Sequence, residues 1–298
     1  MKHKVSFLFL LLFCAILSAC QSLDQTDSEQ INPDSRKTYI ENKGSDTLVN
    51  LALAWAEEYQ QLYPGVQISV TGGGSGTGFT SLLNGTITIA NASRQIKPEE
   101  IDAARENGFE PIEFIVANDA IAVIVNPENP IENLSLQQVS KIYKGEIKNW
   151  QQVGGEDRPI VKLSRETNSG THVYFLETVI RLGSKDDNSI FSADTLLLPS
   201  SEGIIAEVRD NPNAIGYDGL GYVTPDVKTI ALSQEAHSNY IIPSAETVLS
   251  GEYPISRHLY MYTRGEPKGA ELAYLEWILS SDAQEITADL GFVPVIRE

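Results

Sequence analysis

Two short segments of this chain combine glycine with small hydroxyl residues where a strand is predicted to run into a helix. They occupy residues 72–78 and 164–171. The first N–H groups of a helix have no intrahelical partner, and the helix dipole adds partial positive charge at the same end, so such junctions bind anions. The second segment adds Arg165, whose planar guanidinium suits a carboxylate or a phosphate. We interpret the two segments as the halves of one binding cleft, in a chain of 298 residues that is long enough for two lobes.

The glycine-rich segment does not match the glycine motifs of three enzyme classes. A P-loop requires lysine after its last glycine, whereas Phe79 follows Gly78. No frame supplies the G-x-G-x-x-G of a dinucleotide-binding fold, and Thr77 breaks the G-x-S-x-G of a serine hydrolase. We therefore expect no catalytic residue and no cofactor. A hydrolase stays open as an alternative, as does a tight turn that merely needs glycine.

The N-terminus is predicted to be a targeting segment. Lys2 and Lys4 precede an apolar run over residues 5–17, which is too short for a comfortable membrane span. The run ends in Leu-Ser-Ala-Cys, which resembles the lipobox of bacterial lipoproteins. The resemblance implies a signal peptide over residues 1–19, cleavage before Cys20, and a palmitate-type lipid anchor on its sulfur; an ordinary secretory signal is the alternative. Residues 20–37 would hold this lipidated cysteine and a flexible tether, because they contain few sizeable apolar side chains.

The net charge and the cysteine content limit the kinds of partner and metal site that this protein can have. The formal net charge is −18, and it becomes about −20 when Lys2 and Lys4 leave with the leader. So acidic a surface argues against nucleic acid as a partner and against binding to an anionic bilayer by charge. The two cysteines, Cys14 and Cys20, both lie in the leader region, so the body can form neither a disulfide nor a thiolate metal site. We expect no metal.

The elements that position the two segments alternate between strand and helix. Apolar spacing predicts strands near 39–40, 66–70, 87–90, 121–125, 160–163, 215–217, 222–223 and 259–263. It predicts helices at 48–62, 79–83, 98–108, 135–145, 173–180 and 272–279, with a further helix that ends at Gly291. Ser45 or Asp46 is expected to cap the first helix, and Ser135 with Gln138 forms a capping box. The alternation predicts an α/β fold with a largely parallel sheet.

Over residues 43–295 the chain resembles the phosphate-binding proteins of bacterial ABC-type phosphate importers. The likeness rests on motifs that occur in one order, at residues 44–47, 72–78, 92–94, 122–127, 142–150, 165–171, 215–222 and 291–295. It implies the class II periplasmic-binding-protein fold, in which two α/β lobes with mixed sheets and flanking helices are joined by two crossing strands. We expect lobe 1 to comprise residues 38–122 plus 254–298 and lobe 2 to comprise residues 123–253.

The resemblance also implies the ligand, its contacts and its destination. The ligand-binding residues carried over are Ser45, Asp46, Thr47, Ser75, Gly76, Thr77, Ser93 and Arg94 in lobe 1, and Arg165, Ser169, Gly170 and Thr171 in lobe 2. They imply high-affinity binding of inorganic phosphate with lobe closure, and delivery to an ABC-type permease in the cytoplasmic membrane. The protein would be a monomer in the periplasm or on the outer cell surface, attached to the lipid bilayer through Cys20. A receptor for sulfate, arsenate or molybdate, or a signalling or adhesion lipoprotein, stays open.

Two positions depart from the pattern of this family. Arg94 stands where the family often has an aspartate that accepts the proton of hydrogen phosphate, and an arginine cannot accept a hydrogen bond. Asp46 is either the substitute acceptor or an N-cap that pairs with Arg94. Thr167 stands where relatives often carry an acid that holds the arginine of this segment. Glu166 either takes over that role or points to solvent.

Overall fold

The computed structural model describes residues 37–235 and 239–295. The predicted signal peptide, Cys20 and nearly all of the tether lie outside the described residues. Within them, no helix combines the length and the apolar character that a membrane crossing requires.

The longer strands follow the sequence predictions, whereas the short strands at Asn133–Ser135, Leu196–Leu198, Lys228–Thr229 and Ala231–Ser233 were not predicted. The bounds of the strands are β1 Thr38–Gly44, β2 Val66–Thr71, β3 Ile89–Ala92, β4 Pro111–Val125, β5 Asn133–Ser135, β6 Val161–Arg165, β7 Leu196–Leu198, β8 Ala214–Gly219, β9 Lys228–Thr229, β10 Ala231–Ser233 and β11 Ser256–Arg264. The strand expected at 222–223 is wrong, because Leu220–Tyr222 forms a 3-10 turn (η5) directly after β8.

The predicted helices lie close to their expected positions, whereas the helices at Ser201–Asp210 and Ala245–Leu249 were not predicted. The helices are α2 Val49–Leu62, α3 Ser75–Leu83, α4 Pro98–Glu106, α5 Leu136–Tyr143, α6 Gly170–Phe175, α7 Ser201–Asp210, α8 Ala245–Leu249, α9 Ala270–Ile278 and α10 Ser281–Asp289, with shorter turns η2 Asp46–Leu48, η3 Trp150–Val153 and η4 Leu176–Ile180. The predicted capping box of α5 is confirmed, since Gln138 N–H donates to Ser135 Oγ and the Gln138 side chain accepts from Ser135 N–H. The predicted cap of the first helix is wrong: η2 precedes α2, and neither Ser45 nor Asp46 accepts a capping hydrogen bond there.

The main sheet is mixed rather than largely parallel. Its strand order is β2-β1-β3-β11-β4-β8-β6-β7, with β9 also paired to β4. The β1, β2 and β3 strands pair in parallel, as do β6, β7 and β8. Between these two groups, β11 and β4 run antiparallel to their neighbours. We call β2-β1-β3-β11-β4 the first half-sheet and β4-β8-β6-β7 the second.

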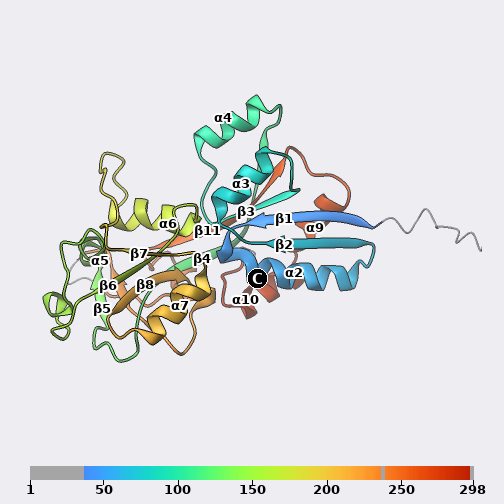
Figure 1. Ribbon diagram of the computed structural model, residues 1–298. Helices are drawn as coiled ribbons and strands as arrows, with labels where there is room; N and C mark the ends of the chain where they lie inside the picture. The colour runs from blue at the N-terminus through green and yellow to red at the C-terminus, as the bar shows by residue number, and fades with distance from the viewer. Residues whose placement is uncertain (1–36, 236–238, 296–298) are drawn as a thin grey trace, which may run out of the picture. The chain divides into compact units, whose positions relative to one another are not determined.

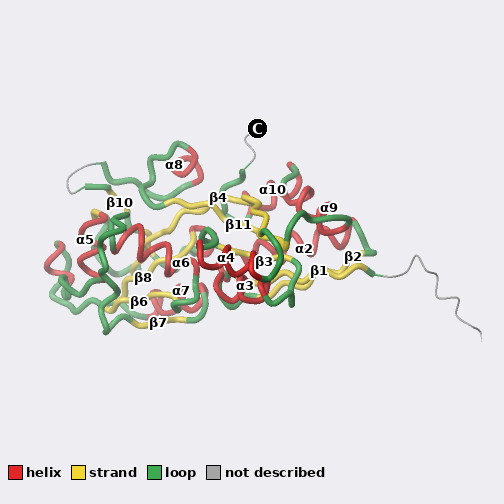
Figure 2. The backbone as a smooth tube through the Cα atoms, turned by 90° about the horizontal axis from the view of Figure 1, so that it is seen from above, coloured by secondary structure: helices red, strands yellow, loops and turns green. Residues whose placement is uncertain are grey.

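The long strand β4 belongs to both half-sheets. Its residues up to Ala120 pair with β11, and its residues from Ile121 onward pair with β8. Figures 1 and 2 show β4 and β11 side by side where the two halves meet. The chain therefore passes from one half to the other through paired strands, which hold the two sets of loops at the carboxyl ends of the parallel strands near each other.

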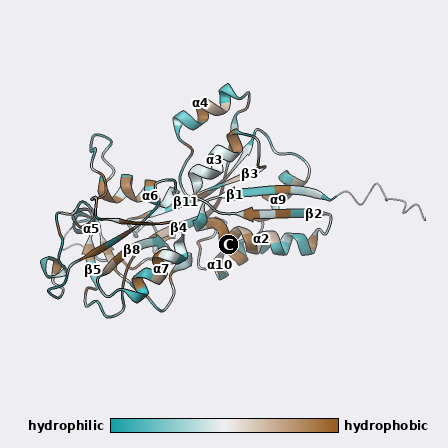
Figure 3. Ribbon diagram, viewed as in Figure 1, coloured by the Kyte–Doolittle hydropathy of each residue, from teal (hydrophilic) through white to brown (hydrophobic). Residues whose placement is uncertain are grey.

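Helices cover both faces of the sheet. In Figure 1, α3 lies on one face of the first half-sheet and α2 on the other, while α6 and α7 lie on opposite faces of the second. The continuous apolar run at the end of β4 follows from this arrangement. Ile121, Val123 and Val125 pack into one hydrophobic cluster, whereas Ala122 and Ile124 pack into another. A strand buried on both faces needs apolar residues at every position, and Figure 3 shows the central strands as mainly hydrophobic.

Candidate anion-binding site

The N-termini of α3 and α6, which begin in the two segments singled out by sequence, lie against each other. Gly76 N–H donates to Asn168 O at 3.0 Å, and Asn168 Nδ2 donates to Gly73 O at 2.9 Å. A Cβ placed on Gly74 would lie 2.8 Å from Asn168 O, and Gly74 has φ +89°, so glycine is required there for two reasons. The structure therefore brings together two helix ends, where the helix dipoles and the first-turn N–H groups without an intrahelical partner attract anions.

Hydroxyl groups surround this junction. Ser75 Oγ accepts a hydrogen bond from Ser93 N–H at 3.0 Å, and the two Oγ atoms lie 3.3 Å apart. A Cβ on Gly170 would lie 2.4 Å from Ser75 Oγ and 2.5 Å from Ser93 Oγ. Ser169 caps α6, since its Oγ accepts a hydrogen bond from Thr171 N–H. The start of α6 thus packs so closely against two buried serines that there is no room for a Cβ at position 170.

Thr47 and Thr171 form a second hydroxyl pair from distant parts of the chain. Their Oγ1 atoms lie 2.9 Å apart, and both side chains are buried. Two other predicted residues make local contacts: Ser45 N–H donates to Asn91 O, and Thr77 Oγ1 donates to Gly73 O. Their hydroxyl and backbone groups support the loops beside the site.

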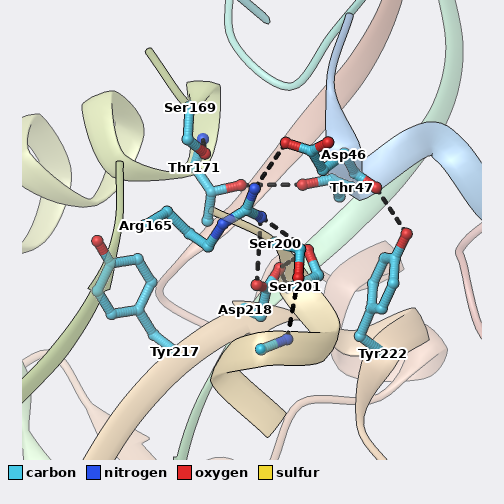
Figure 4. A network of polar contacts seen from close by, with 12 residues as sticks. Asp46, Thr47, Arg165, Ser169, Thr171, Ser200, Ser201, Tyr217, Asp218 and Tyr222 are labelled. Atoms are coloured by element: carbon cyan, nitrogen blue, oxygen red, sulfur yellow. Dashed lines mark hydrogen bonds and ion pairs between the residues drawn. The ribbon is translucent and has the colours of Figure 1, made fainter. Parts of the chain in front are cut away.

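Arg165 is the central cation of the site, with an exposure of only 1%. Its Nη2 donates to Asp46 Oδ2 at 2.7 Å, and its Nη1 donates to Ser201 Oγ at 2.8 Å and lies 3.5 Å from Asp218 Oδ2. Figure 4 shows these groups converging on the guanidinium. Glu166 does not take over the role of holding Arg165, because Glu166 is exposed and Asp46 and Asp218 pair with the arginine.

Asp46 and Arg94 do not pair with each other; each has a different charged partner. Asp46 Oδ1 accepts from Gly73 N–H at 2.8 Å while Oδ2 accepts from Arg165, so this carboxylate links the glycine-rich loop to the arginine. Arg94 makes two hydrogen bonds to Glu100, at 2.7 and 2.8 Å, and stacks over the Phe79 ring. The alternative in which Asp46 pairs with Arg94 is therefore wrong.

Arg257, which was not predicted from the sequence, also contacts residues of the site. Its Nη2 donates to Thr171 Oγ1 at 3.0 Å and to Thr47 Oγ1 at 3.3 Å, and Asp119 accepts from the same guanidinium. A signal was present: Asp119 directly precedes the apolar run of β4, and Arg257 shortly precedes the apolar residues of β11. Charged residues next to the apolar runs of two buried strands are unusual unless the two charges pair with each other. Nothing in the sequence, however, says that these two strands are neighbours.

Burial perturbs the acids of this network. It raises the pKa of Asp119 to about 6, although the Arg257 guanidinium works in the opposite direction. Burial also raises the pKa of Asp218, opposed by the charge of Arg165. These shifts show that desolvation outweighs pairing at both carboxyl groups. An anion that accepted from the two arginines would compete with these acids for the same donors.

A buried serine–histidine contact lies beside the site. Ser164 Oγ is 3.1 Å from His172 Nδ1 and 2.6 Å from the Tyr217 hydroxyl, and His172 Nδ1 also faces Arg165 O at 2.9 Å. Burial lowers the pKa of His172. Ser164 is fully buried, so this cluster braces the start of α6 rather than offering a nucleophile. Among the described residues, no group of histidines, cysteines or acids is placed to hold a metal ion.

Comparison with known proteins identifies the superfamily to which this chain belongs. A family model described as a PBP superfamily domain matches residues 31–282. The phosphate-binding protein PstS of Pseudomonas aeruginosa is 32% identical over 93% of this chain and 90% of its own length. PstS of Bacillus subtilis is 31% identical over 99% and 95%, respectively. A substrate-binding protein from Clostridium perfringens, solved with bound phosphate, aligns with a TM-score of 0.78 at 31% identity, over 87% of this chain and all of that one.

The mixed sheet with flanking helices is thus the fold of the PBP superfamily, as the family resemblance implied. Within that class, the chain belongs to the family of PstS phosphate-binding proteins.

Proposed function

We propose that this protein binds inorganic phosphate outside the cytoplasm and delivers it to an ABC-type importer. The observation that carries the proposal is the convergence of two helix N-termini, at Ser75 and Gly170, with the buried guanidinium of Arg165. The names of the relatives, and the phosphate bound to the clostridial structure, support the same ligand. We further propose that the protein is a receptor without catalytic activity, and that it acts as a monomer.

The proposed ligand contacts are the backbone and hydroxyl groups around the two helix starts, together with arginine. They are Thr47, Ser75, Gly76, Ser93, Arg165, Ser169, Gly170 and Thr171, with Asp46 as acceptor for a phosphate proton. Hydrogen bonds to charged groups contribute about 1.5–3 kcal/mol each, and micromolar binding needs about 8 kcal/mol. About six such bonds suffice even after the free-energy cost of association is subtracted. The net charge of −18 does not prevent this, because long-range repulsion is screened over about 8 Å.

We propose that phosphate closes two lobes, residues 38–122 plus 254–298 and residues 123–253. The paired strands β4 and β11 would act as the hinge, near Ala122 and Ser256, because they are the strands at which the two half-sheets meet. The closed form would then dock on the permease. Small-angle scattering should show compaction when phosphate is added to phosphate-free protein. An unchanged radius of gyration would exclude this closure.

We propose that residues 1–19 are removed and that a lipid on Cys20 attaches the protein to the membrane. The support is the Leu-Ser-Ala-Cys sequence at residues 17–20. In the producing cell, Cys20→Ser should move the protein from the membrane fraction to the soluble extracytoplasmic fraction. Retention of the variant on washed membranes would contradict the proposal.

The function is tested by calorimetric titration of the chain from residue 21 onward, freed of bound phosphate by partial unfolding and dialysis. Phosphate should bind with one-to-one stoichiometry and micromolar or tighter Kd, and sulfate should give little heat. Arg165→Gln should abolish the signal, whereas Arg158→Gln, an arginine outside the site, should leave it intact. Equal binding of sulfate would instead indicate a general oxyanion receptor. The absence of heat from every oxyanion tested would overturn the proposal.

A further inference from the structure

Arg257 and Asp119 form a buried ion pair beneath the hydroxyl groups of the site. They are direct partners in the antiparallel pairing of β11 and β4, so their side chains lie on the same face of the sheet. Asp119 Oδ2 accepts from Arg257 Nε at 3.2 Å and from Nη2 at 3.0 Å, and Oδ1 accepts from Leu220 N–H at 3.1 Å. Both carboxylate oxygens are thus occupied, which fixes the guanidinium in one place.

The guanidinium touches three separate segments of the site. Besides Thr47 and Thr171, it reaches Ser93, whose backbone carbonyl accepts from Nη1 at 2.9 Å. Thr47 lies in η2, Thr171 lies in α6 and Ser93 directly follows β3, so the three residues are far apart in the sequence. A single side chain on β11 therefore connects groups that flank both helix starts.

The chemistry of arginine determines which way the two threonine hydroxyls point. A guanidinium carries donors only, so both threonine oxygens must accept from Arg257. Each hydroxyl proton is then directed elsewhere. Because the two oxygens lie 2.9 Å apart, one hydroxyl donates to the other, and one proton remains for an outside acceptor. Arg257 in this way leaves the Thr47–Thr171 pair with one hydroxyl proton to donate, which suits an oxyanion.

Stability alone does not account for this pair. A buried ion pair recovers its desolvation cost only partly, and an apolar pair of similar size is often as stable. The ion pair also needs glycine at position 219, because a Cβ there would lie 2.8 Å from Asp119 Oδ2 and 3.1 Å from Thr47 Cγ2. The raised pKa of Asp119 shows that burial acts against the carboxylate at this position. The charge is retained next to the site in spite of this cost.

We propose that Arg257, held by Asp119, is a positioning residue that orients the hydroxyls of Thr47 and Thr171 so that the pair donates its remaining proton to the bound anion. This inference rests on the proposed phosphate-binding function. It assigns to Arg257 an effect on affinity that passes through the two threonines, and to Asp119 the role of holding the guanidinium in place.

The test combines calorimetry with urea unfolding, on the chain from residue 21 onward. Arg257→Lys keeps the charge but cannot supply the planar fork, and it should weaken phosphate binding about 10-fold; Arg257→Gln should weaken it about 100-fold. Thr171→Val alone should cost about 30-fold in affinity, but in the Arg257→Gln background it should cost less than threefold. Arg264→Gln, an exposed arginine at the other end of β11, is the matched control.

The outcomes separate the inference from the function on which it rests. If wild-type protein does not bind phosphate, the proposed function fails. If the wild type binds and Arg257→Lys lowers only the urea midpoint, with Kd within threefold of wild type, Arg257 is a structural brace and the inference is overturned. Additive losses for Arg257→Gln and Thr171→Val would also overturn it. Should Arg257→Gln fail to fold, the same comparison is made with Thr171→Val in the Arg257→Lys background.

Discussion

Replacement of Gly170 by alanine isolates the contact between the two helix starts. Gly170 does not have a positive φ, so alanine is acceptable to its backbone. The obstacle is space alone: the new Cβ would lie 2.4 Å from Ser75 Oγ and 2.5 Å from Ser93 Oγ. Ordinary contact begins near 3.4 Å. We therefore expect the start of α6 and the two serine side chains to move apart by about 1 Å.

A displacement of this size removes hydrogen bonds from the ligand. A donor at about 2.9 Å that retreats by about 1 Å no longer makes a hydrogen bond. If two of the donors at the start of α6 are lost, at about 1.5 kcal/mol each, binding weakens by about 3 kcal/mol. We expect Gly170→Ala to raise the Kd for phosphate by at least about 100-fold in calorimetry. The free energy of unfolding without phosphate should stay equal or rise, because alanine favours a helix over glycine by up to about 1 kcal/mol and separation of the two proposed lobes would relieve the contact.

Gly65→Ala is the matched control, since Gly65 also lacks a positive φ and a Cβ there would meet nothing within 4 Å. Its Kd should equal that of the wild type. If Gly170→Ala binds phosphate within threefold of the wild type while Gly65→Ala is unchanged, the two helix starts do not enclose the anion and the reasoning fails.

Three further predictions concern charged groups. Asp46→Asn should reduce the preference for phosphate over sulfate, because the amide no longer accepts a phosphate proton as a carboxylate does; an unchanged ratio of the two Kd values would exclude Asp46 as the acceptor. Arg94→Gln should lower the free energy of unfolding by about 2 kcal/mol, because it breaks two charged hydrogen bonds to Glu100; a urea midpoint equal to that of the wild type would count against this. Asp119 has a folded pKa of about 6 against 3.8 for the free group, so its contribution to stability is present below about pH 4 and is lost as the pH rises through about 6, on the order of 3 kcal/mol. Asp119→Asn should flatten this decline in urea unfolding without phosphate, and identical pH profiles would refute the assignment.

Local chemistry could be read from the sequence. The order of strands and helices, the capping box of Ser135 and Gln138, and the two glycine-hydroxyl segments all depend on residues that are near neighbours in the chain. A helix start has N–H groups without an intrahelical partner whatever the rest of the fold does, so residues 72–78 and 164–171 could be predicted as a candidate anion site. The resemblance of motifs also identified the family, which the comparisons confirm.

The partners of the buried charges were decided only by the tertiary structure. Arg165 is held by Asp46 and Asp218 rather than by the adjacent Glu166, and Arg257 meets Asp119 because β11 lies next to β4. A buried charge must find its counterion among whichever segments the sheet order places beside it, and that order brings together residues more than a hundred positions apart. The sequence by itself therefore determined the kind of site, whereas the packing of two antiparallel strands between two parallel groups decided which side chains complete it.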